Sequence, residues 1–345
     1  MKRATKHILV TGGAGFIGSA FIRYLLKHAA SCERVVNVDL LTYAGNLNNL
    51  ASIENDPRYL FIKGDICNAD LIEKACRDHG IDTIVHFAAE SHVDRSIEDP
   101  LNFLNTNVKG TAVLLETVRQ YPHIHFHHVS TDEVYGSLND QGLFCEESPY
   151  RPNSPYAASK AASDHFVRSY AQTYQISTTL SHCSNNYGPF QHTEKFIPLM
   201  ILKCLEKNPL TVYGDGTNIR DWIHVDDHVE AIWSIVERGR KNEIYDIGGE
   251  CEKRNIDLLY VLIDEFAKLT NQDPLFYHSL ITFVPDRPGH DFRYGMDCGK
   301  IKKELNWRPR HSFSDGIRRT VKWYLRFYEN SMCDPSSTEV DPFSK

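Results

Sequence analysis

The sequence has 345 residues, of which 41% are hydrophobic and 24% are charged, and its formal net charge is −7 at pH 7. This is the composition of a globular protein, long enough for one large domain or two modest ones. The negative charge argues against nucleic acid or an anionic membrane as the main partner. No apolar run approaches the roughly 20 residues of a transmembrane helix, so we expect no membrane partner.

Cysteine usage and the N-terminus indicate the compartment. The nine cysteines are odd in number and scattered, which is not typical of a disulfide framework. The apolar residues 8–10 stop at Thr11, which is too short for the core of a signal peptide. We therefore expect a reduced, cytoplasmic location. No CxxC pair is present, and the histidines between His123 and His128 have no evident carboxylate or thiol partners, so we expect no metal.

The first predicted elements are a strand, a glycine turn and a helix. His7–Thr11 is typical of a short buried strand, and Ser19–Ala29 has helical periodicity. Between them, Gly12, Gly15 and Gly18 have the spacing GxxGxxG. In a dinucleotide-binding turn one glycine makes the bend, one lets the backbone approach a pyrophosphate, and one packs helix against strand. A simple turn is the alternative, but the flanking strand and helix favour a cofactor site.

The second predicted strand, Arg34–Val38, is followed directly by Asp39. This acid lies 21 residues after Gly18, close to the spacing of the carboxylate that binds the adenosine ribose of a dinucleotide. A carboxylate there would repel a 2′-phosphate, so NAD is favoured over NADP. A helix cap or a loop acid is the alternative interpretation.

Strands and helices continue to alternate through the first half of the chain. We expect strands at Tyr59–Lys63, Thr83–Phe87 and His125–Val129, and helices at Ala69–Asp78 and Pro100–Gln120. This alternation predicts an α/β fold, a Rossmann-like doubly wound parallel sheet with right-handed crossovers. Ligands of such sheets bind outside the carboxyl ends of the strands, so the residues that follow each strand are site candidates.

Two groups of reactive side chains follow the fifth strand. Thr131, Asp132 and Glu133 come at its carboxyl end, and Tyr156 and Lys160 share one helix face at positions i and i+4. A tyrosine that serves as base at neutral pH needs its pKa lowered by roughly 3 units. One cation supplies about 1–3 units, so Lys160 is barely enough and an oxidised nicotinamide ring would complete the shift. A packed tyrosine beside an exposed lysine, and a solvated acid pair, are the alternatives.

After the helix that ends near Tyr174 and a sixth strand at Thr178–Cys183, the regular alternation stops. We expect a smaller, mixed C-terminal substrate domain there. The expected domains are residues 1–188, which also take a strand and a helix from about 222–250, and a discontinuous domain over 189–330. The loop Asp286–His290 offers an arginine and a histidine to a phosphate, with a surface ion-pair loop about equally plausible. The polar residues 331–345 are expected to fray.

The glycine motif together with the Tyr156/Lys160 pair resembles the extended short-chain dehydrogenase/reductase family. Five further stretches narrow the resemblance to the dTDP-glucose 4,6-dehydratase family, over about residues 7–328. They are residues 39–46 (DLLTYAGN), 88–96 (AAESHVDRS), 130–136 (STDEVYG), 183–189 (CSNNYGP) and 286–290 (DRPGH). The adjacent Thr131, Asp132 and Glu133 are the specific part, because related epimerases and decarboxylases usually lack the paired acids.

The resemblance implies contacts with NAD, with a dTDP-glucose substrate and with a second copy of the chain. Cofactor contacts are implied for Gly12, Gly15, Phe16, Ile17, Gly18, Asp39, Asp65, Ile66, Ala88, Ala89, Thr106, Tyr156, Lys160 and Asn186. Substrate contacts are implied for Ser91, Thr131, Asn185, Lys195, Phe196, Tyr213, Arg220, Asn255, Arg287 and His290. A homodimer is implied through the helices near residues 100–120 and 154–174.

The implied reaction is a hydro-lyase reaction in which water is lost from the hexose. Tyr156 takes the proton of the sugar 4-hydroxyl and Thr131 orients that oxygen. Glu133 is the implied base for the C5 proton, and Asp132 is the implied acid for the departing 6-hydroxyl. Burial and mutual repulsion can give two adjacent carboxyls different protonation states, but the sequence alone leaves open which of them is neutral. Other NAD-dependent nucleotide-sugar enzymes remain the alternative: a UDP-glucose 4,6-dehydratase, a 4-epimerase or a decarboxylase.

Overall fold

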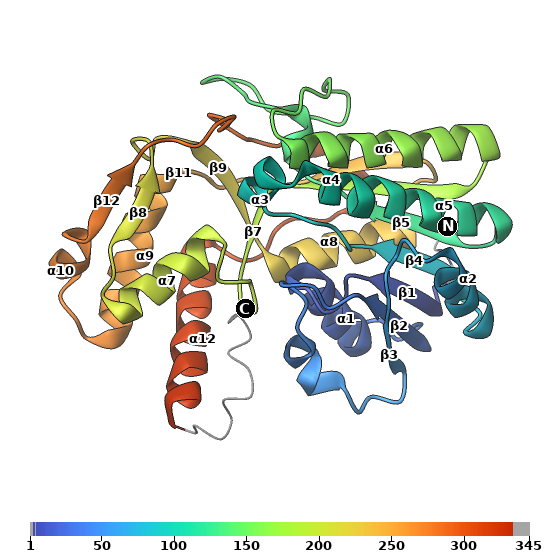
Figure 1. The fold of residues 1–345 in the computed structure, drawn as a ribbon, viewed down its shortest axis with the longest axis horizontal. Coiled ribbons are helices and arrows are strands. Elements are labelled where there is room, and N and C mark those ends of the chain that lie inside the picture. The colour runs from blue at the N-terminus through green and yellow to red at the C-terminus, as the bar shows by residue number, and fades with distance from the viewer. Residues whose placement is uncertain (1–2, 4, 334–345) are drawn as a thin grey trace.

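A seven-stranded parallel sheet dominates the computed structural model, which describes residue 3 and residues 5–333 (Figure 1). Its strand order is β3-β2-β1-β4-β5-β6-β10, and every neighbouring pair is parallel. The predicted α/β class and doubly wound parallel sheet are therefore confirmed. The strands are β1 (His7–Thr11), β2 (Arg34–Asp39), β3 (Tyr59–Lys63), β4 (Thr83–His86), β5 (His125–Val129), β6 (Ser177–Cys183) and β10 (Glu243–Ile247).

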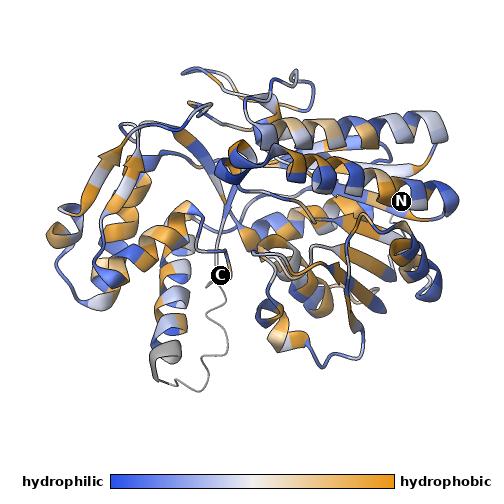
Figure 2. Cartoon of the chain, viewed as in Figure 1, coloured by the Kyte–Doolittle hydropathy of each residue, from blue (hydrophilic) through white to orange (hydrophobic). Residues whose placement is uncertain are grey.

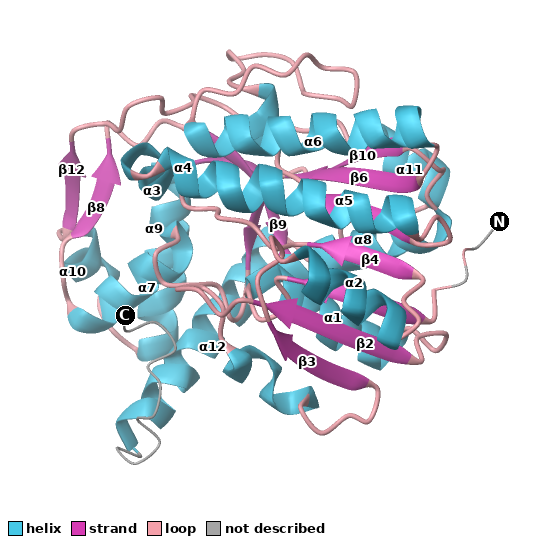
Figure 3. Cartoon of the chain, turned by 45° about the vertical axis from the view of Figure 1, so that its right-hand side comes forward, coloured by secondary structure: helices cyan, strands magenta, loops and turns pink. Residues whose placement is uncertain are grey.

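Helices cover both faces of this sheet (Figure 3). On one face lie α1 (Phe16–His28), α8 (Val225–Arg238) and α11 (Gly299–Leu305); on the other lie α2 (Ala69–Asp78), α5 (Thr111–Gln120) and α6 (Pro155–Tyr174). Strands buried on both faces are apolar along their whole length rather than alternating. Ile8, Leu9 and Val10 of β1 are all fully buried, and Figure 2 shows the orange of apolar residues along the sheet.

The strand order reverses between β1 and β4, because the chain first moves outward to β2 and β3 and then returns past β1. Such a switch point opens a crevice at the carboxyl ends of the strands. The predicted helix after β1 begins at Phe16, earlier than the expected Ser19. Gly15 takes its N-cap position without a side-chain cap, so the first backbone N–H groups of α1 face this crevice.

The second part of the molecule, on the left in Figure 1, has a core of its own. It combines a three-stranded sheet, β11-β9-β7, with a two-stranded one, β12-β8. Apolar residues of α7, α9 and α12 pack around them. The elements are β7 (Asn185–Tyr187), α7 (Phe196–Glu206), β8 (Leu210–Tyr213), β9 (Ile219–His224), β11 (Glu252–Arg254), α9 (Asn255–Thr270), α10 (Pro274–His278), β12 (Ile281–Val284) and α12 (Phe313–Cys333).

The predicted elements differ from the structure mainly where segments are short. The helix expected at Pro100–Gln120 is α4 (Pro100–Phe103), a π-helical stretch (Leu104–Gly110) and α5 in succession. The sequence does not indicate α3 (Val93–Glu98), the 3₁₀ helices at Leu47–Ile53 and Asp132–Tyr135, or the short elements β7, β11, β12, α10 and α11. Few residues carry the periodicity of such segments, so their partners in space determine their structure.

The predicted C-terminal tail falls at the limit of the described residues. Helix α12 continues to Cys333, inside the tail expected from residue 331, and residues 334–345 lie outside the described residues. The boundary between the two predicted domains stays a prediction. Within the described residues, no helix is both long enough and apolar enough to cross a lipid bilayer.

Candidate active site

A cavity of about 330 Å³ opens at the switch point of the large sheet. Its walls come from the carboxyl ends of β1, β2, β4, β5 and β6 and from the loops that follow them. Every residue predicted to contact the cofactor, from Gly12 to Asn186, lines this cavity. The five predicted catalytic residues line it as well: Thr131, Asp132, Glu133, Tyr156 and Lys160. The fold therefore brings the two predicted groups together.

The glycine turn between β1 and α1 leaves no room for side chains. Gly12 has φ of +70°, and a Cβ there would lie 2.6 Å from the backbone nitrogen of Ala88. A Cβ on Gly18 would lie 2.2 Å from the Gly12 oxygen. These contacts are the close backbone approach and the tight helix–strand packing that a dinucleotide-binding turn requires.

Asp39 ends β2 at the cavity wall and is mostly buried. Its Oδ2 accepts a hydrogen bond from the Ala14 N–H at 2.9 Å, and its Oδ1 accepts one from the Leu41 N–H at 2.8 Å. Burial raises the pKa of this carboxyl, while the two backbone donors oppose the shift. The bonds fix the orientation of the carboxylate next to the glycine turn, the position predicted for an acid that binds the ribose of a dinucleotide.

Tyr156 and Lys160 project from one face of α6, which begins at Pro155 behind a Ser154 side-chain cap. Both side chains are buried. The Lys160 Nζ donates to the Val129 carbonyl at 2.9 Å, and burial lowers its pKa to about 8. The pKa of Tyr156 is raised well above its usual value, first by burial and then by the negative charge of Glu133. The lowered pKa expected for this tyrosine is therefore not produced by the chain alone.

Asp132 and Glu133 begin a 3₁₀ helix for which Thr131 is the N-cap, its hydroxyl accepting from the Glu133 N–H at 3.3 Å. The two carboxyls have different surroundings. Asp132 is 2% exposed, and burial, Glu133 and Asp221 raise its pKa well above the usual value. Burial also raises the pKa of Glu133, but its environment includes more positive charge.

The cations that oppose the shift at Glu133 are Arg287, Arg220 and Lys195, in decreasing order of effect. At Asp132, two neighbouring acids add to the effect of burial and Arg220 opposes it. The pair therefore holds its proton on Asp132 more readily than on Glu133. This asymmetry favours Asp132 as the neutral member of the pair.

The predicted substrate residues fall into two sets. Ser91, Thr131, Asn185 and Lys195 line the cavity, and the Lys195 Nζ donates to the Ser91 carbonyl at 2.8 Å. The other predicted residues lie on the second part of the molecule and do not line the cavity itself. They are Phe196, Tyr213, Arg220, Asn255, Arg287 and His290.

Arg220 and Arg287 nevertheless extend the positive charge of the site toward the second part. Arg220 is buried on β9, donates to the Asp291 carbonyl at 2.8 Å, and has its guanidinium 4.3 Å from the centroid of the Tyr294 ring. Arg287 lies 3.7 Å from Asp94 of α3. Two guanidinium groups, the side-chain type that binds phosphate well, thus lie on the side of the acid pair toward the second part.

Three segments that no sequence pattern connects meet at the edge of the cavity. The guanidinium of Arg95, on α3, lies 3.8 Å from the centroid of the Tyr43 ring. The Arg95 Nε also lies 3.6 Å from the Glu194 carboxylate, which lines the cavity. These contacts bring together residues 42–45, 92–95 and 192–195, which lie in or near the motifs quoted above. No spacing rule predicts that three segments so far apart in the sequence meet.

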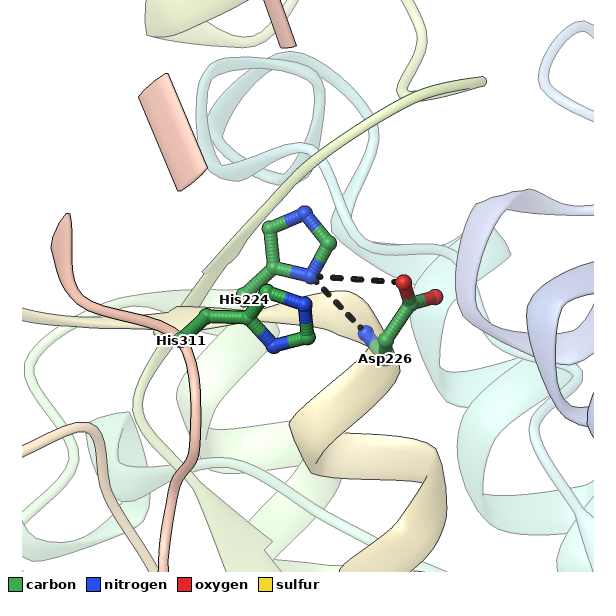
Figure 4. Close-up of side chains that lie close together, drawn as sticks. All are labelled: His224, Asp226 and His311. Atoms are coloured by element: carbon green, nitrogen blue, oxygen red, sulfur yellow. Dashed lines mark hydrogen bonds and ion pairs between the residues drawn. The ribbon is translucent and has the colours of Figure 1, made fainter. Parts of the chain in front are cut away.

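One group of described side chains has the geometry of a candidate metal site, His224, Asp226 and His311, with ligand atoms within 4.8 Å of one another (Figure 4). His224 Nδ1 accepts from the Asp226 N–H at 3.3 Å. Both ring nitrogens of His311 have other partners, Asp227 at 2.9 Å and the Arg319 guanidinium at 3.1 Å. A metal ion would have to displace a cation, so the structure does not favour one here. The absence of a metal stays a prediction.

Comparison with known proteins accords with this geometry. A family model described as GDP-mannose 4,6 dehydratase matches residues 9–320. The dTDP-glucose 4,6-dehydratase of Haemophilus influenzae is 49% identical over 332 residues, which cover 92% of this chain and 98% of the relative. The chain belongs to the dTDP-glucose 4,6-dehydratase family.

Solved structures place the chain in the same family. A crystal structure of dTDP-glucose 4,6-dehydratase from Streptomyces venezuelae, with NAD bound, aligns with a TM-score of 0.89 and 48% identity. The alignment covers 98% of this chain and 100% of that one. A UDP-glucose 4-epimerase from Thermotoga maritima also shares the fold, with a TM-score of 0.83 and 28% identity over 93% of this chain and 99% of that one. The fold is thus common to both activities, and the dTDP-glucose 4,6-dehydratases are the more similar in sequence.

Proposed function

We propose that this chain converts dTDP-glucose into dTDP-4-keto-6-deoxyglucose and regenerates its NAD in every turnover. The observation that carries the proposal is the acid pair Asp132 and Glu133, in unequal environments, in the same cavity as Tyr156 and Lys160. Loss of water from a hexose requires one group that gives a proton and another that takes one. The 45–52% identity to named dTDP-glucose 4,6-dehydratases supports the same activity.

The cavity fits NAD on its own geometry. The glycine turn at Gly12 excludes side chains, the N-terminus of α1 faces the cavity, and Asp39 presents a fixed carboxylate. Phe16, Ile17 and Asn186 would hold the cofactor together with these groups. Bound NAD supplies an acceptor for the hydride of the C4 carbinol and returns that hydride later in the turnover.

The side chains of the acid pair and α6 account for the proton transfers. We assign Tyr156 as the base that takes the 4-hydroxyl proton, and Thr131 as the group that orients the 4-oxygen. The C4 ketone acidifies the C5 proton, and we assign Glu133 as the base that removes it. Asp132 gives its proton to the 6-hydroxyl, which leaves as water. After the hydride reaches C6, the proton removed from C5 is returned there, and the proton taken from the 4-hydroxyl replaces the one that Asp132 gave to the leaving water.

The raised pKa of Tyr156 sets a condition on the first step. In the chain alone, this phenol keeps its proton at neutral pH. The ammonium of Lys160 and the positive charge of an oxidised nicotinamide together supply the opposing field. We therefore expect the phenolate to form only in the NAD⁺ complex.

The substrate's nucleotide diphosphate would extend toward the second part of the molecule. Arg220, Arg287 and His290 are the proposed partners of its phosphates, and Lys195 spans the region between them and the acid pair. Phe196, Tyr213 and Asn255 are the further proposed contacts. The thymine base follows from the family rather than from a contact in this structure.

The competing function is another NAD-dependent nucleotide-sugar reaction, such as 4-epimerisation or dehydration of UDP-glucose. An epimerase returns the hydride to C4 and has no use for a neutral acid at the 6-hydroxyl. Separate incubations with dTDP-glucose and UDP-glucose, followed by mass spectrometry and NMR, distinguish these functions. Deuterium placed at C4 of the sugar should appear on the C6 methyl of the product. Return of the deuterium to C4, or no 4-keto-6-deoxy product, would refute the proposal.

We also propose that the chain is a cytoplasmic homodimer. Three apolar side chains on or next to α4 and α6 are exposed to solvent in the single chain. Leu101 of α4 is 73% exposed, Leu104 directly after α4 is 50% exposed, and Phe166 of α6 is 40% exposed. A self-association face on these helices would cover them. The eight cysteines whose side chains the structure describes are free, which suits a reducing compartment. Analytical ultracentrifugation tests the dimer, and a monomer at micromolar concentration would refute it.

A further inference from the structure

A buried chain of charged side chains lies behind Lys160, outside the cavity. Asp164 follows Lys160 by one turn of α6, His182 lies on β6, and Asp246 lies on β10. All three are at most 2% exposed, and none of them lines the cavity. No step of the proposed reaction uses them, yet burying four ionisable groups together is costly unless they compensate one another.

This series of buried charged side chains begins at the Lys160 ammonium. His128 Nε2, on β5, lies 3.4 Å from Lys160 Nζ and 3.3 Å from Asp164 Oδ1. Against the effect of burial, hydrogen bonds from His128 and His182 lower the pKa of this buried carboxyl. Burial lowers the pKa of His128 to about 4, so its imidazole is neutral at pH 7. Asp164 is therefore the carboxylate that faces the buried ammonium across a neutral ring.

The second Asp164 oxygen, Oδ2, accepts hydrogen bonds from three directions. The Ser130 hydroxyl donates to it at 2.9 Å and the Tyr150 hydroxyl at 3.2 Å, while His182 Nε2 lies 3.2 Å away. The other His182 nitrogen, Nδ1, lies 2.9 Å from Asp246 Oδ1. His182 thus bridges two carboxylates.

These contacts order the charges along the chain. Burial acts against the His182 cation, but its bonds to the two aspartates prevail and raise its pKa to about 9. Two cations, Lys160 and His182, then alternate with two carboxylates, Asp164 and Asp246. The Asp164 charge is the largest effect that opposes the desolvation of Lys160.

We propose that Asp164 is a positioning residue that keeps Lys160 in its ammonium form, and that His182 keeps Asp164 ionised. Neither residue touches the predicted cofactor or substrate positions, so they act through Lys160. This inference rests on the proposed function, because it assigns a cause to the charge state that the C4 oxidation step requires.

The consequence for the reaction follows from counting protons. The active form has the Lys160 ammonium and the Tyr156 phenolate. A neutral amine beside a neutral phenol has the same number of protons, so the two forms compete at every pH. The Asp164 charge favours the ammonium, and without it the lysine gives up the proton in place of the tyrosine.

The other titratable groups near the ammonium do not take over this role. His86 and His128 are buried, and burial lowers the pKa of each, so both rings are neutral at pH 7. Burial raises the pKa of the Cys183 thiol, so it is neutral at pH 7. The groups that face His182 are Tyr135 and Tyr150, whose pKa values are also raised, together with Asp164 and Asp246.

The test uses Asp164→Asn in the NAD-loaded enzyme, with Tyr150→Phe as the matched control. The control removes a hydrogen bond to the same Asp164 oxygen and another to His182, but no charge. Reduction of bound NAD by dTDP-glucose is followed in a single turnover across pH, per mole of bound cofactor. A nearby opposite charge typically shifts a pKa by about 1–3 units, and this variant removes the carboxylate that opposes the desolvation of Lys160, so we expect the plateau rate of Asp164→Asn to fall roughly ten-fold or more.

The direction of the pH shift separates this mechanism from simple damage to the fold. In Asp164→Asn, the rising limb of the curve of NAD-reduction rate against pH should move to lower pH, because the first proton now leaves Lys160. The plateau rate of the same curve should fall. The KM for dTDP-glucose should stay unchanged. Tyr150→Phe should keep both the limb and the plateau of the wild type. A lower rate with an unmoved limb, or an equal shift in the control, would overturn the inference.

A second variant covers the case in which Asp164→Asn does not fold. His182→Gln leaves Asp164 and Asp246 as buried carboxylates without the cation between them, so Asp164 takes up a proton. We expect the same downward shift of the limb, of smaller size. A wild-type profile in folded His182→Gln would refute the role of His182. A wild-type enzyme that reduces no NAD with dTDP-glucose would instead refute the proposed function.

Discussion

Replacing Asp132 with asparagine should separate the two halves of the reaction. The change keeps the shape of the side chain but removes the proton that Asp132 would give to the departing 6-hydroxyl. A positioned general acid typically contributes 10²–10⁴-fold, which corresponds to about 3–5 kcal/mol of activation free energy. C4 oxidation depends on Tyr156 and Thr131 and should continue. Reduced cofactor should therefore accumulate in the variant.

The same substitution should make the protein more stable at neutral pH. The pKa of Asp132 is raised well above its usual value in the folded chain, while the unfolded chain ionises it near the ordinary value of about 3.9. Above that pH, folding must take up a proton, and the cost grows until the folded pKa is reached. Asparagine takes up no proton, so the denaturation midpoint of the variant should rise.

Stopped-flow absorbance of reduced nicotinamide and urea unfolding at pH 7 test both expectations. Asp140→Asn is the matched control, because it removes a carboxylate from an exposed position of the following loop. It should change neither measurement. If Asp132→Asn instead abolishes C4 oxidation and accumulates no reduced cofactor, the assignment of Asp132 as the acid of the second half is wrong.

Four other changes have defined outcomes. Tyr156→Phe should block cofactor reduction while calorimetry still detects sugar-nucleotide binding; reduction at the wild-type rate would refute the base. Gly12→Ala should purify without NAD, because its Cβ would lie 2.6 Å from a backbone nitrogen at φ of +70°, and a normal cofactor content would contradict this. Arg287→Gln should move the Glu133-dependent limb of dehydration to higher pH, because Arg287 is the main charge that lowers this pKa; an unmoved limb counts against it. The stability that the His182 charge contributes is fully present below pH 6.5 and lost through pH 9, so the wild-type urea midpoint should fall over this range, and a constant midpoint would contradict the charge on His182.

The large sheet could be predicted from the regular alternation of strand-like and helical segments, and its buried strand β1 appears as an apolar run. Short strands carry no such signal: β11 has three residues, and its antiparallel pairing with β9 defines it. The walls of the cofactor cavity were predictable because they directly follow strands.

The electrostatics of the site were less accessible to sequence reasoning. The raised pKa of Tyr156 comes from burial and from nearby acids, neither of which a YxxxK spacing reveals. The link from Lys160 to Asp246 joins β5, α6, β6 and β10, and only the Lys160–Asp164 step is local in sequence. Spacing rules detect neighbours along one helix or one turn, so contacts across a sheet escape them.

The position of β10 has a consequence for how the chain is made. This strand closes the sheet edge beside β6, but the chain reaches it only after β7, α7, β8, β9 and α8. While the ribosome is still synthesising those segments, β6 is an unpaired edge whose backbone groups are open to association with other chains. We expect nascent chains that stall between residues 190 and 240 to aggregate or to bind chaperones, and chains extended beyond residue 247 to become protected.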